Sequence, residues 1–337
     1  MTSDATPLAV TMGEPAGIGG EITLKAWLRR DRRMPPFVAI DDAGRLERLA
    51  ATLGLAVPVR TVATAADAVA TFARALPVLH RPLSVEPLPG RPDPANTPAV
   101  VAAIETAVAL ARAGTIAGVV TNPIHKRVLY RSGFEFPGHT EFIAALAGDG
   151  AVPVMMLACP ELKVVPVTVH VSLREAVDAL TPEAIVRAGT ITARALRLDF
   201  GIARPRLAVA GLNPHAGEDG AMGGEDAAIV APAVATLRAH GIEARGPLPA
   251  DTLFSARARS GYDAALCMYH DQALIPLKTL DFDGGVNVTL GLPLVRTSPD
   301  HGTALDIAGS GRASEASLVA AIALAAEIAA RRAAAAA

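Results

Sequence analysis

The chain has 337 residues, of which 51% are hydrophobic and 19% charged, and its formal net charge is -2 at pH 7. This length favours two lobes or one large α/β unit, and the composition excludes a disordered chain. The near-neutral charge gives no electrostatic argument for a nucleic-acid or acidic-membrane partner.

The chain ends and the cysteines indicate a soluble protein of the cytoplasm. Cys159 and Cys267 lie in apolar runs and cannot form a disulfide framework, so we expect two small buried side chains in a reducing compartment. The N-terminus, MTSDATPLAVTMGEP, has no basic or long apolar region, which predicts no signal peptide. The Ala-rich segment from 317 contains Glu327 and Arg331, and we predict a terminal helix there instead of a membrane span.

Short apolar runs alternate with longer Ala-rich segments of helical period along the chain. This alternation predicts βα units and a largely parallel sheet. We expect strands at 7–12, 36–40, 116–121, 152–158, 164–170, 206–212, 263–269 and 286–290. The Pro-rich segment 77–98 is expected to be irregular.

Three helices have recognisable ends. Thr97-Pro98 supplies an N-cap and a first-turn proline for a helix that closes at Gly114. Thr181 begins a second helix that runs toward Leu198. A third is expected over about 225–240, because Gly241 follows it.

Five expected strands end in polar loops marked by Gly, Pro or His. These loops read GEPAGIGGE, TNPIHK, HVS, NPHAGEDG and YHDQALIPLK. In open α/β sheets ligands bind beyond the carboxyl ends of the strands. We therefore expect the five loops to converge on one crevice.

Three histidines, His170, His215 and His270, follow expected strands. They are 45 and 55 residues apart (215−170 and 270−215), which is no local metal motif. Each alone is equally consistent with a hydrogen-bonded histidine at a strand end. Their shared position favours a catalytic divalent metal site with an open position. Asp251 and Asp271 are candidates to orient a ligand imidazole or to join the coordination shell.

The segment 13–21, GEPAGIGGE, is glycine-rich and lies between an expected strand and a helix. It indicates either a tight turn or a close backbone approach to an anion. Ile22 stands where the third glycine of G-x-G-x-x-G would fall, so the standard Rossmann fingerprint is absent. The sequence also lacks a P-loop and a G-x-S-x-G elbow, which argues against nucleotide-triphosphate and serine-hydrolase chemistry.

Several polar side chains near these loops are suited to an anionic substrate, although each alone is also consistent with a solvated surface residue. They are Lys126, His139, Thr140, Lys278 and Arg296. Asn287 differs, because a lone amide in an apolar run is either a satisfied core group or a ligand contact.

Seven segments together resemble the signature blocks of the 4-hydroxythreonine-4-phosphate dehydrogenase (PdxA) family, NAD-dependent enzymes of vitamin B6 biosynthesis. The segments are MGEPAGIGGE, TNPIHK, GHTEF, NPHAGEDG, PADTLF, YHDQALIPLK and GGVNVTLGLPLVRTSPDHGTALDIAGSG. They run from residue 12 to about 313, so the resemblance covers nearly the whole chain. Gly20 stands where many family members have proline.

The resemblance implies an α/β, two-lobed architecture similar to the isocitrate and isopropylmalate dehydrogenases, with largely parallel sheets and no standard Rossmann fingerprint. Residues 1–134 plus 281–337 would form a discontinuous cofactor-side lobe. Residues 135–280 would form the metal, substrate and dimerisation lobe. The family is homodimeric with an active site shared between subunits, so the three histidines of one chain need not bind one ion.

The resemblance also assigns residues. It places a divalent ion (Zn, Mg or Co) on His170, His215 and His270. It places substrate contacts on His139, Thr140, Lys278, Asn287 and Arg296. It places the adenosine half of NAD (or NADP) near His301, Gly302 and Asp306. The general base stays open among Asp251, Asp271 and Lys126.

The implied reaction is oxidation of 4-phosphooxy-L-threonine at C3, followed by decarboxylation to 3-amino-2-oxopropyl phosphate, in pyridoxal 5'-phosphate biosynthesis. The metal would polarise the hydroxyl and the nascent ketone. The nearest alternative is a paralogous 4-phospho-D-threonate or 4-phospho-D-erythronate dehydrogenase of sugar-acid catabolism. A more distant alternative is a metal-dependent phosphosugar hydrolase or aldolase, which would not need the 300–311 cofactor loop.

Overall fold

The computed structural model describes residues 6–30, 34–136, 138–148 and 150–336, so residues 1–5 of the predicted N-terminal segment lie outside it. The chain divides into two compact units. Unit 1 is Met1–Pro153 with Leu292–Ala330, and unit 2 is Val154–Gly291 with Arg331–Ala337. The sequence-based borders were 134/135 and 280/281. The roles of the two lobes in cofactor binding and dimerisation stay predictions.

Unit 1 contains strands in the order β3-β4-β2-β1-β5-β12, and every neighbouring pair is parallel. The strands are β1 (Leu8–Thr11), β2 (Phe37–Asp41), β3 (Val59–Thr61), β4 (Leu76–His80), β5 (Val119–Thr121) and β12 (Arg296–Pro299). β1, β2 and β5 are buried along their whole length. Continuous apolar runs of this kind form strands whose two faces are both covered by helices.

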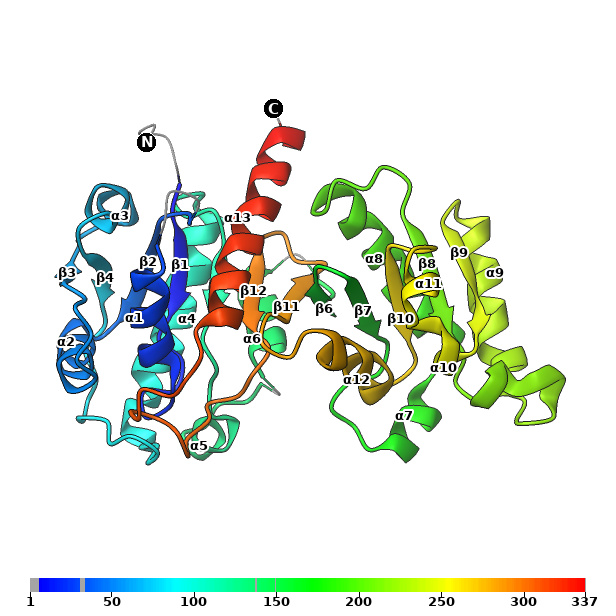
Figure 1. Cartoon of the computed structure of the whole chain (residues 1–337), viewed down its shortest axis with the longest axis horizontal. Helices are drawn as coiled ribbons and strands as arrows, with labels where there is room; N and C mark the ends of the chain where they lie inside the picture. The colour runs from blue at the N-terminus through cyan, green and yellow to red at the C-terminus, as the bar shows by residue number, and fades with distance from the viewer. Residues whose placement is uncertain (1–5, 31–33, 137, 149, 337) are drawn as a thin grey trace. The chain divides into compact units, whose positions relative to one another are not determined.

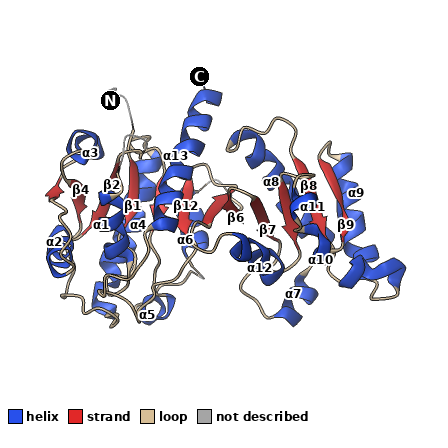
Figure 2. Cartoon of the chain, in the orientation of Figure 1, coloured by secondary structure: helices blue, strands red, loops and turns tan. Residues whose placement is uncertain are grey.

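The helices of unit 1 lie alongside these strands (Figures 1 and 2). They are α1 (Gly19–Leu28), α2 (Ala43–Thr52), α3 (Ala65–Phe72), α4 (Thr97–Arg112), α5 (Lys126–Arg131) and α6 (His139–Ala147), with α13 (Ala316–Ala336) beginning in this unit. α4 and α6 pack on the sheet through Ile104 and Phe142, which share a core cluster with Val38 and Val119.

By length and composition, Pro94–Arg112 is the one segment within the described residues that is apolar enough to cross a membrane. Its helical part, α4, buries Val100, Ala103 and Ile104 in the core of unit 1. Core helices of globular proteins pass the same test of composition, so the segment gives no case for a membrane span.

Unit 2 has the strand order β11-β6-β7-β10-β8-β9. Its strands are β6 (Val154–Cys159), β7 (Leu162–Pro166), β8 (Arg206–Ala210), β9 (Glu243–Leu248), β10 (Ala264–Cys267) and β11 (Val286–Leu290). The pairs β7–β10, β10–β8 and β8–β9 are parallel, whereas β11–β6 and β6–β7 are antiparallel. The carboxyl ends of β7, β10 and β8 therefore share one edge of the sheet.

The helices of unit 2 include the one that carries His270. They are α7 (Leu173–Ala179), α8 (Pro182–Leu198), α9 (Ala231–Ala239), α10 (Ala250–Leu253), α11 (Ala256–Arg259) and α12 (His270–Leu280), with the short segments η2 (Pro214–Gly220) and η3 (Asp226–Val230). α12 packs on the sheet through Leu274 and Leu277. Cys159 and Cys267 belong to the same cluster as free thiols, which confirms the prediction that both side chains are buried.

All eight expected strands form, and the α/β fold with largely parallel strands is confirmed. β3, β4, β9 and β12 were not predicted. The prediction that 77–98 is irregular is wrong at its start, because β4 continues to His80. Pro77 lies near the beginning of that strand, where a missing N–H is tolerated.

The helix ends were predicted with one error. Thr181 caps α8 by accepting a hydrogen bond from the Ala184 N–H, as predicted. Thr97 is not an N-cap: the 3-10 turn η1 (Pro94–Asn96) runs directly into α4, so Thr97 is already helical. The helix expected over 225–240 forms, but its first turn, η3, is a π-helix.

Candidate active site

Three neighbouring strand ends of unit 2 carry the candidate metal ligands. His170 follows β7, His215 follows β8, and His270 is the first residue of α12 after β10. Because these strands are parallel neighbours, the three loops leave the same edge of the sheet. His170 and His215 are exposed and His270 is partly exposed, so their imidazoles are accessible to ligands.

His170 and His270 lie close together. Their ring centroids are 5.9 Å apart, with 44° between the ring planes. Zinc–nitrogen bonds of about 2.0–2.1 Å place the centres of two imidazoles that share an ion about 5–6 Å apart. The Nδ1 atom of His270 is 2.7 Å from Oδ1 of Asp271, which leaves Nε2 as the metal-binding atom. This pair fits a divalent metal ion.

His215 lies on a loop with an unusual backbone. Its φ is 54°, and Ala216, Glu218 and Asp219 also have positive φ values. Non-glycine residues in this conformation carry strain that the surrounding structure must support. Asp226 provides that support here, since its buried carboxylate accepts hydrogen bonds from Leu212 N (2.7 Å) and Asn213 N (2.9 Å). Helix α10, which carries the exposed Asp251, packs against this loop.

No group of three or more His, Cys, Asp or Glu side chains forms a metal cluster among the residues that the structure describes. The structure therefore brings His170 and His270 together but does not complete a three-histidine site in this chain. A site shared between subunits would be incomplete in one chain. The three-histidine assignment stays a prediction.

Two predicted substrate residues also belong to unit 2. Lys278 lies in the last turn of α12, with Nζ 5.8 Å from the ring centroid of Phe282. Asn287 lies on β11, and its buried Oδ1 has no hydrogen-bond partner within the described part of the chain. A satisfied core amide would have such a partner, so Asn287 fits a ligand contact better.

In unit 1, Arg296 on β12 is buried beside β5. Its Nη2 donates to Oγ1 of Thr121 at 2.7 Å. Burial lowers the pKa of Arg296 to about 10, and the Glu141 carboxylate partly offsets this effect. The guanidinium thus remains charged at neutral pH while it is largely removed from water, which strengthens its attraction for an anion.

His139 and Thr140 open helix α6 in the same unit. The Nε2 atom of His139 is buried without a hydrogen-bond partner among the described residues. Burial, together with the cations Arg296 and Lys126, holds the pKa of His139 well below 6.5. A Cβ atom on Gly138 would stand 3.2 Å from Lys126 Nζ, so the absence of a side chain there lets Lys126 approach the start of α6. This neutral imidazole among cations suits a phosphate or carboxylate.

The predicted cofactor loop, 300–311, lies against the glycine-rich loop 13–21. Ile18 N donates to Thr303 O at 3.1 Å, and a Cβ on Gly17 would stand 2.9 Å from that carbonyl oxygen. His301 is partly exposed, with Nδ1 3.1 Å from Gly302 O, while Gly302 and Asp306 are exposed. An accessible Asp carboxylate suits the hydroxyls of a nucleoside ribose, so the loop fits the implied cofactor.

Asn122, which follows β5, holds the glycine-rich loop in place. Its Nδ2 donates to Thr11 O and to Thr23 Oγ1, both at 2.9 Å. Cβ atoms on Gly13 and Gly19 would meet the Asn122 side chain at 2.8 and 3.2 Å. Gly13 and Gly19 are therefore required because the glycine-rich loop packs closely against the side chain of Asn122.

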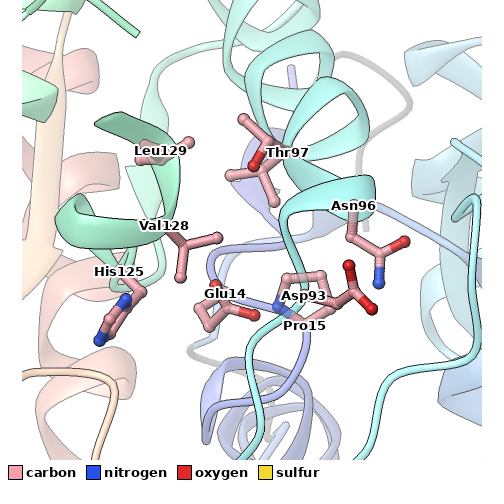
Figure 3. A pocket seen from close by; sticks show the side chains of 9 residues that line it. Glu14, Pro15, Asp93, Asn96, Thr97, His125, Val128 and Leu129 are labelled. Carbon is pink, nitrogen blue, oxygen red and sulfur yellow. The ribbon is translucent and has the colours of Figure 1, made fainter. Parts of the chain in front are cut away.

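A small acidic pocket lies beside the same loop (Figure 3). It is lined by Glu14, Pro15, Asp93, Asn96, Thr97, Val100, His125, Val128 and Leu129. Burial raises the pKa of Glu14, although the Ala16 N–H donates to its carboxylate at 3.0 Å and His125 is nearby. The carboxylates make the pocket better suited to hydroxyl groups than to phosphate. Glu14 and His125 were not predicted as site residues.

The chain matches the family model described as "Pyridoxal phosphate biosynthetic protein PdxA" over residues 33–325. This chain belongs to the PdxA family. A PdxA relative from Bradyrhizobium diazoefficiens, named 4-hydroxythreonine-4-phosphate dehydrogenase, is 57% identical over 339 residues, covering 97% of this chain and 98% of the relative. A relative of the same name from Caulobacter vibrioides is 56% identical, covering 97% and 98%.

A solved PdxA-family structure shares the fold. The crystal structure of 4-hydroxythreonine-4-phosphate dehydrogenase from Klebsiella pneumoniae superposes with a TM-score of 0.86 at 41% identity, covering 96% of this chain and 99% of that chain. The resemblance stated from the signature blocks is thereby confirmed. The individual roles of the site residues are not tested by these similarities and stay predictions.

Proposed function

We propose that this chain oxidises 4-phosphooxy-L-threonine at C3 with NAD (or NADP) and then decarboxylates the product to 3-amino-2-oxopropyl phosphate, in pyridoxal 5'-phosphate biosynthesis. Full-length similarity to relatives named 4-hydroxythreonine-4-phosphate dehydrogenase carries the proposal. The oxidation removes a hydride from C3 and a proton from its hydroxyl group. Loss of carbon dioxide then leaves an electron pair that a proton takes up at C2.

The anionic ends of the substrate are proposed to bind to two sets of residues. In unit 1 these are Arg296, His139 and Thr140, and in unit 2 they are Lys278 and Asn287. Buried Arg296 and the N-terminus of α6 provide weakly screened positive potential for phosphate or carboxylate. Binding energy from these groups would orient the reacting carbon.

We propose His170, His215 and His270 as the holders of a divalent ion, Zn, Mg or Co. Such an ion polarises the oxygen of a hydroxyl or ketone and stabilises negative charge on it. Asp271 would orient the His270 ring through the 2.7 Å contact between its Oδ1 and Nδ1. His301, Gly302 and Asp306 are proposed to hold the nicotinamide cofactor, which accepts the hydride.

Among the three candidates for the general base, Asp251 is the one we favour. Asp271 is engaged with His270, and Lys126 lies beside Gly138 among residues suited to an anion. Asp251 is exposed on α10, which packs against the loop that carries His215. Its carboxylate is therefore accessible to a substrate hydroxyl near that histidine.

We further propose a cytoplasmic homodimer whose active site is shared between subunits. Unit 2 exposes apolar side chains after His170, namely Val171 and Leu173, and on and after α12, namely Ile275 and Phe282. Contiguous exposed apolar surface is typical of a protein–protein interface, and the proposed dimer would cover these side chains. A second chain there would also supply the ligands that one chain lacks.

The test is an assay of the purified, metal-loaded chain with NAD and 4-phosphooxy-L-threonine, following NADH absorbance and release of labelled carbon dioxide. We expect both signals in equal amounts. Turnover of 4-phospho-D-threonate or 4-phospho-D-erythronate in place of this substrate would contradict the proposal and identify the sugar-acid paralogue. Substrate consumption without NADH would instead indicate a hydrolase or an aldolase.

A further inference from the structure

Three buried polar side chains hold the backbones of the loops that carry His170, His215 and His270. They are Thr168, Asp226 and Gln272, with exposed fractions of 9%, 2% and 8%. None was predicted as a site residue, and none needs to touch a ligand. Their hydrogen bonds run from side chain to backbone, so they fix where the loop backbones lie.

Gln272 connects two of the loops directly. Its Oε1 accepts a hydrogen bond from Met268 N, and its Nε2 donates one to Gly211 O, both at 2.7 Å. Met268 comes two residues before His270, and Gly211 comes four residues before His215. Because a backbone N–H only donates and a carbonyl only accepts, this position requires an amide side chain.

Thr168 connects the third loop to the same point. Its Oγ1 donates to Met268 O at 2.8 Å, so both polar backbone atoms of Met268 are held by side chains. Thr168 comes two residues before His170. The backbone around Met268 is therefore a junction through which the positions of all three histidine loops depend on one another.

The need for such a junction follows from the strained loops. His170 has a φ of 51° and His215 a φ of 54°, conformations that a non-glycine residue does not adopt without support. Metal ligands also require accurate placement, and groups that orient a ligand typically affect metal affinity 10–100-fold. A loop free to relax would lose this placement.

We propose that Gln272 is a positioning residue for the metal site, which couples the His270 loop to the His215 loop, with Thr168 adding the His170 loop. This inference rests on the metal assignment under Proposed function. It predicts that removing the amide weakens metal binding although every histidine is retained.

The experiment measures Co²⁺ binding to the full-length chain by visible absorption spectroscopy. Gln272→Met keeps the size and flexibility of the side chain but loses both hydrogen bonds. We expect the Kd for Co²⁺ to rise about tenfold or more and the absorption bands to change, because the ligand geometry relaxes. Thr168→Val should act in the same direction, and Thr168→Ser, which keeps the hydroxyl, should restore binding.

A matched control separates this role from general destabilisation. Thr192 is also buried in unit 2, and its Oγ1 has no hydrogen-bond partner among the described residues. Thr192→Val should therefore leave Co²⁺ binding unchanged. The folded state of each variant is checked by circular dichroism and thermal unfolding.

Gln272 is the only glutamine of the chain, so ¹⁵N-glutamine labelling gives one side-chain amide signal. We expect that signal to exchange slowly with solvent in the metal-free wild-type chain. Fast exchange, or a Gln272→Met variant that binds Co²⁺ as the wild type does, would overturn the positioning role alone. A wild-type chain that binds no Co²⁺ would overturn the metal assignment itself, and this role with it.

Discussion

The two units place loops at strand ends by different means. In unit 1, Asn122 holds the glycine-rich loop, and Gly13 and Gly19 make room by having no side chain. In unit 2, Gln272 has the corresponding position between the His215 and His270 loops, but both loops keep their histidines, and the His215 loop adopts a left-handed backbone conformation. Unit 1 thus offers backbone and buried charge, whereas unit 2 offers side chains that can coordinate an ion.

The candidate site residues of the two units also differ in burial and in the charges around them. Arg296 is 3% exposed, and His139 stays neutral beside it because burial and nearby cations lower its pKa. His170 and His215 are exposed. The charge of a buried cation attracts an anion directly, whereas exposed imidazoles act by binding a metal ion. We therefore expect that anion binding and metal binding can be disrupted separately.

The largest effect is expected from His215→Ala in unit 2. Removing a direct ligand should lower metal-dependent turnover more than about a hundredfold, since loss of an orienting partner already costs 10–100-fold. Because His215 is exposed, the midpoint of thermal unfolding should change little. Turnover at a near-normal rate in metal-stripped buffer would show that the histidine loops do not serve a metal.

Arg296→Lys tests the anion side of the comparison. We expect the KM of the phosphorylated substrate to rise about 10- to 100-fold, because a point charge replaces a bidentate guanidinium and charged hydrogen bonds contribute about 1.5–3 kcal/mol. The KM of NAD should change much less. Steady-state kinetics with each substrate varied in turn measures both, and equal changes would contradict the anchoring role.

Gly17→Ala tests whether close packing between the glycine-rich loop 13–21 and the 300–311 loop is needed for cofactor binding. A Cβ there would stand 2.9 Å from Thr303 O, so the 300–311 loop must shift. We expect a loss of about 1–3 kcal/mol in the free energy of unfolding. We also expect several-fold weaker NADH binding, measured by fluorescence titration. Gly224→Ala is the control, because a Cβ on Gly224 meets no atom within 4 Å; an equal loss in both variants would contradict this explanation.

The smallest effect is a pH dependence from His139. Its pKa is well below 6.5 in the folded chain and about 6.5 in the unfolded chain, so below that pH the unfolded state binds one more proton. The free energy of unfolding should therefore fall as the pH falls, by up to about 1.4 kcal/mol per pH unit, with no contribution above about pH 6.5.

Urea unfolding of the wild type and of His139→Gln from about pH 7.5 to about pH 5 measures this slope. The stability of the wild type relative to the variant should decrease toward the acidic end. Parallel curves for the two proteins would mean that His139 titrates normally, and the buried, cationic description of unit 1 would need revision.

Much of the fold could be predicted because apolar periodicity is a local property. The eight expected strands are runs of buried residues, and helix α8 is capped by Thr181 as its sequence indicates. Of the four strands that were missed, β3 and β12 are short, β9 carries charged residues, and β4 begins the Pro-rich segment. β12 reads RTSP and is nevertheless buried throughout, and its polar side chains bond to distant segments: Arg296 to Thr121 of β5 and Thr297 to Ala321 O of α13. No local pattern reveals that environment.

The candidate residues were predictable where chemistry-bearing side chains follow strands, as His170, His215 and His270 do. Their supporting residues were not. Gln272, Thr168 and Asp226 act through hydrogen bonds to residues as far as 100 positions away, such as Met268 for Thr168. A single threonine or glutamine in a sequence gives no sign of such a partner.

By itself the sequence determined the α/β class, the strand ends with their polar loops, and membership of the PdxA family, because these depend on local apolar patterns and contiguous signature blocks. Only the tertiary structure decided that His170 and His270 lie 5.9 Å apart, that Arg296 is buried against Thr121, and that Gln272 joins two loops. The physical reason is that distances and burial depend on which distant segments pack together.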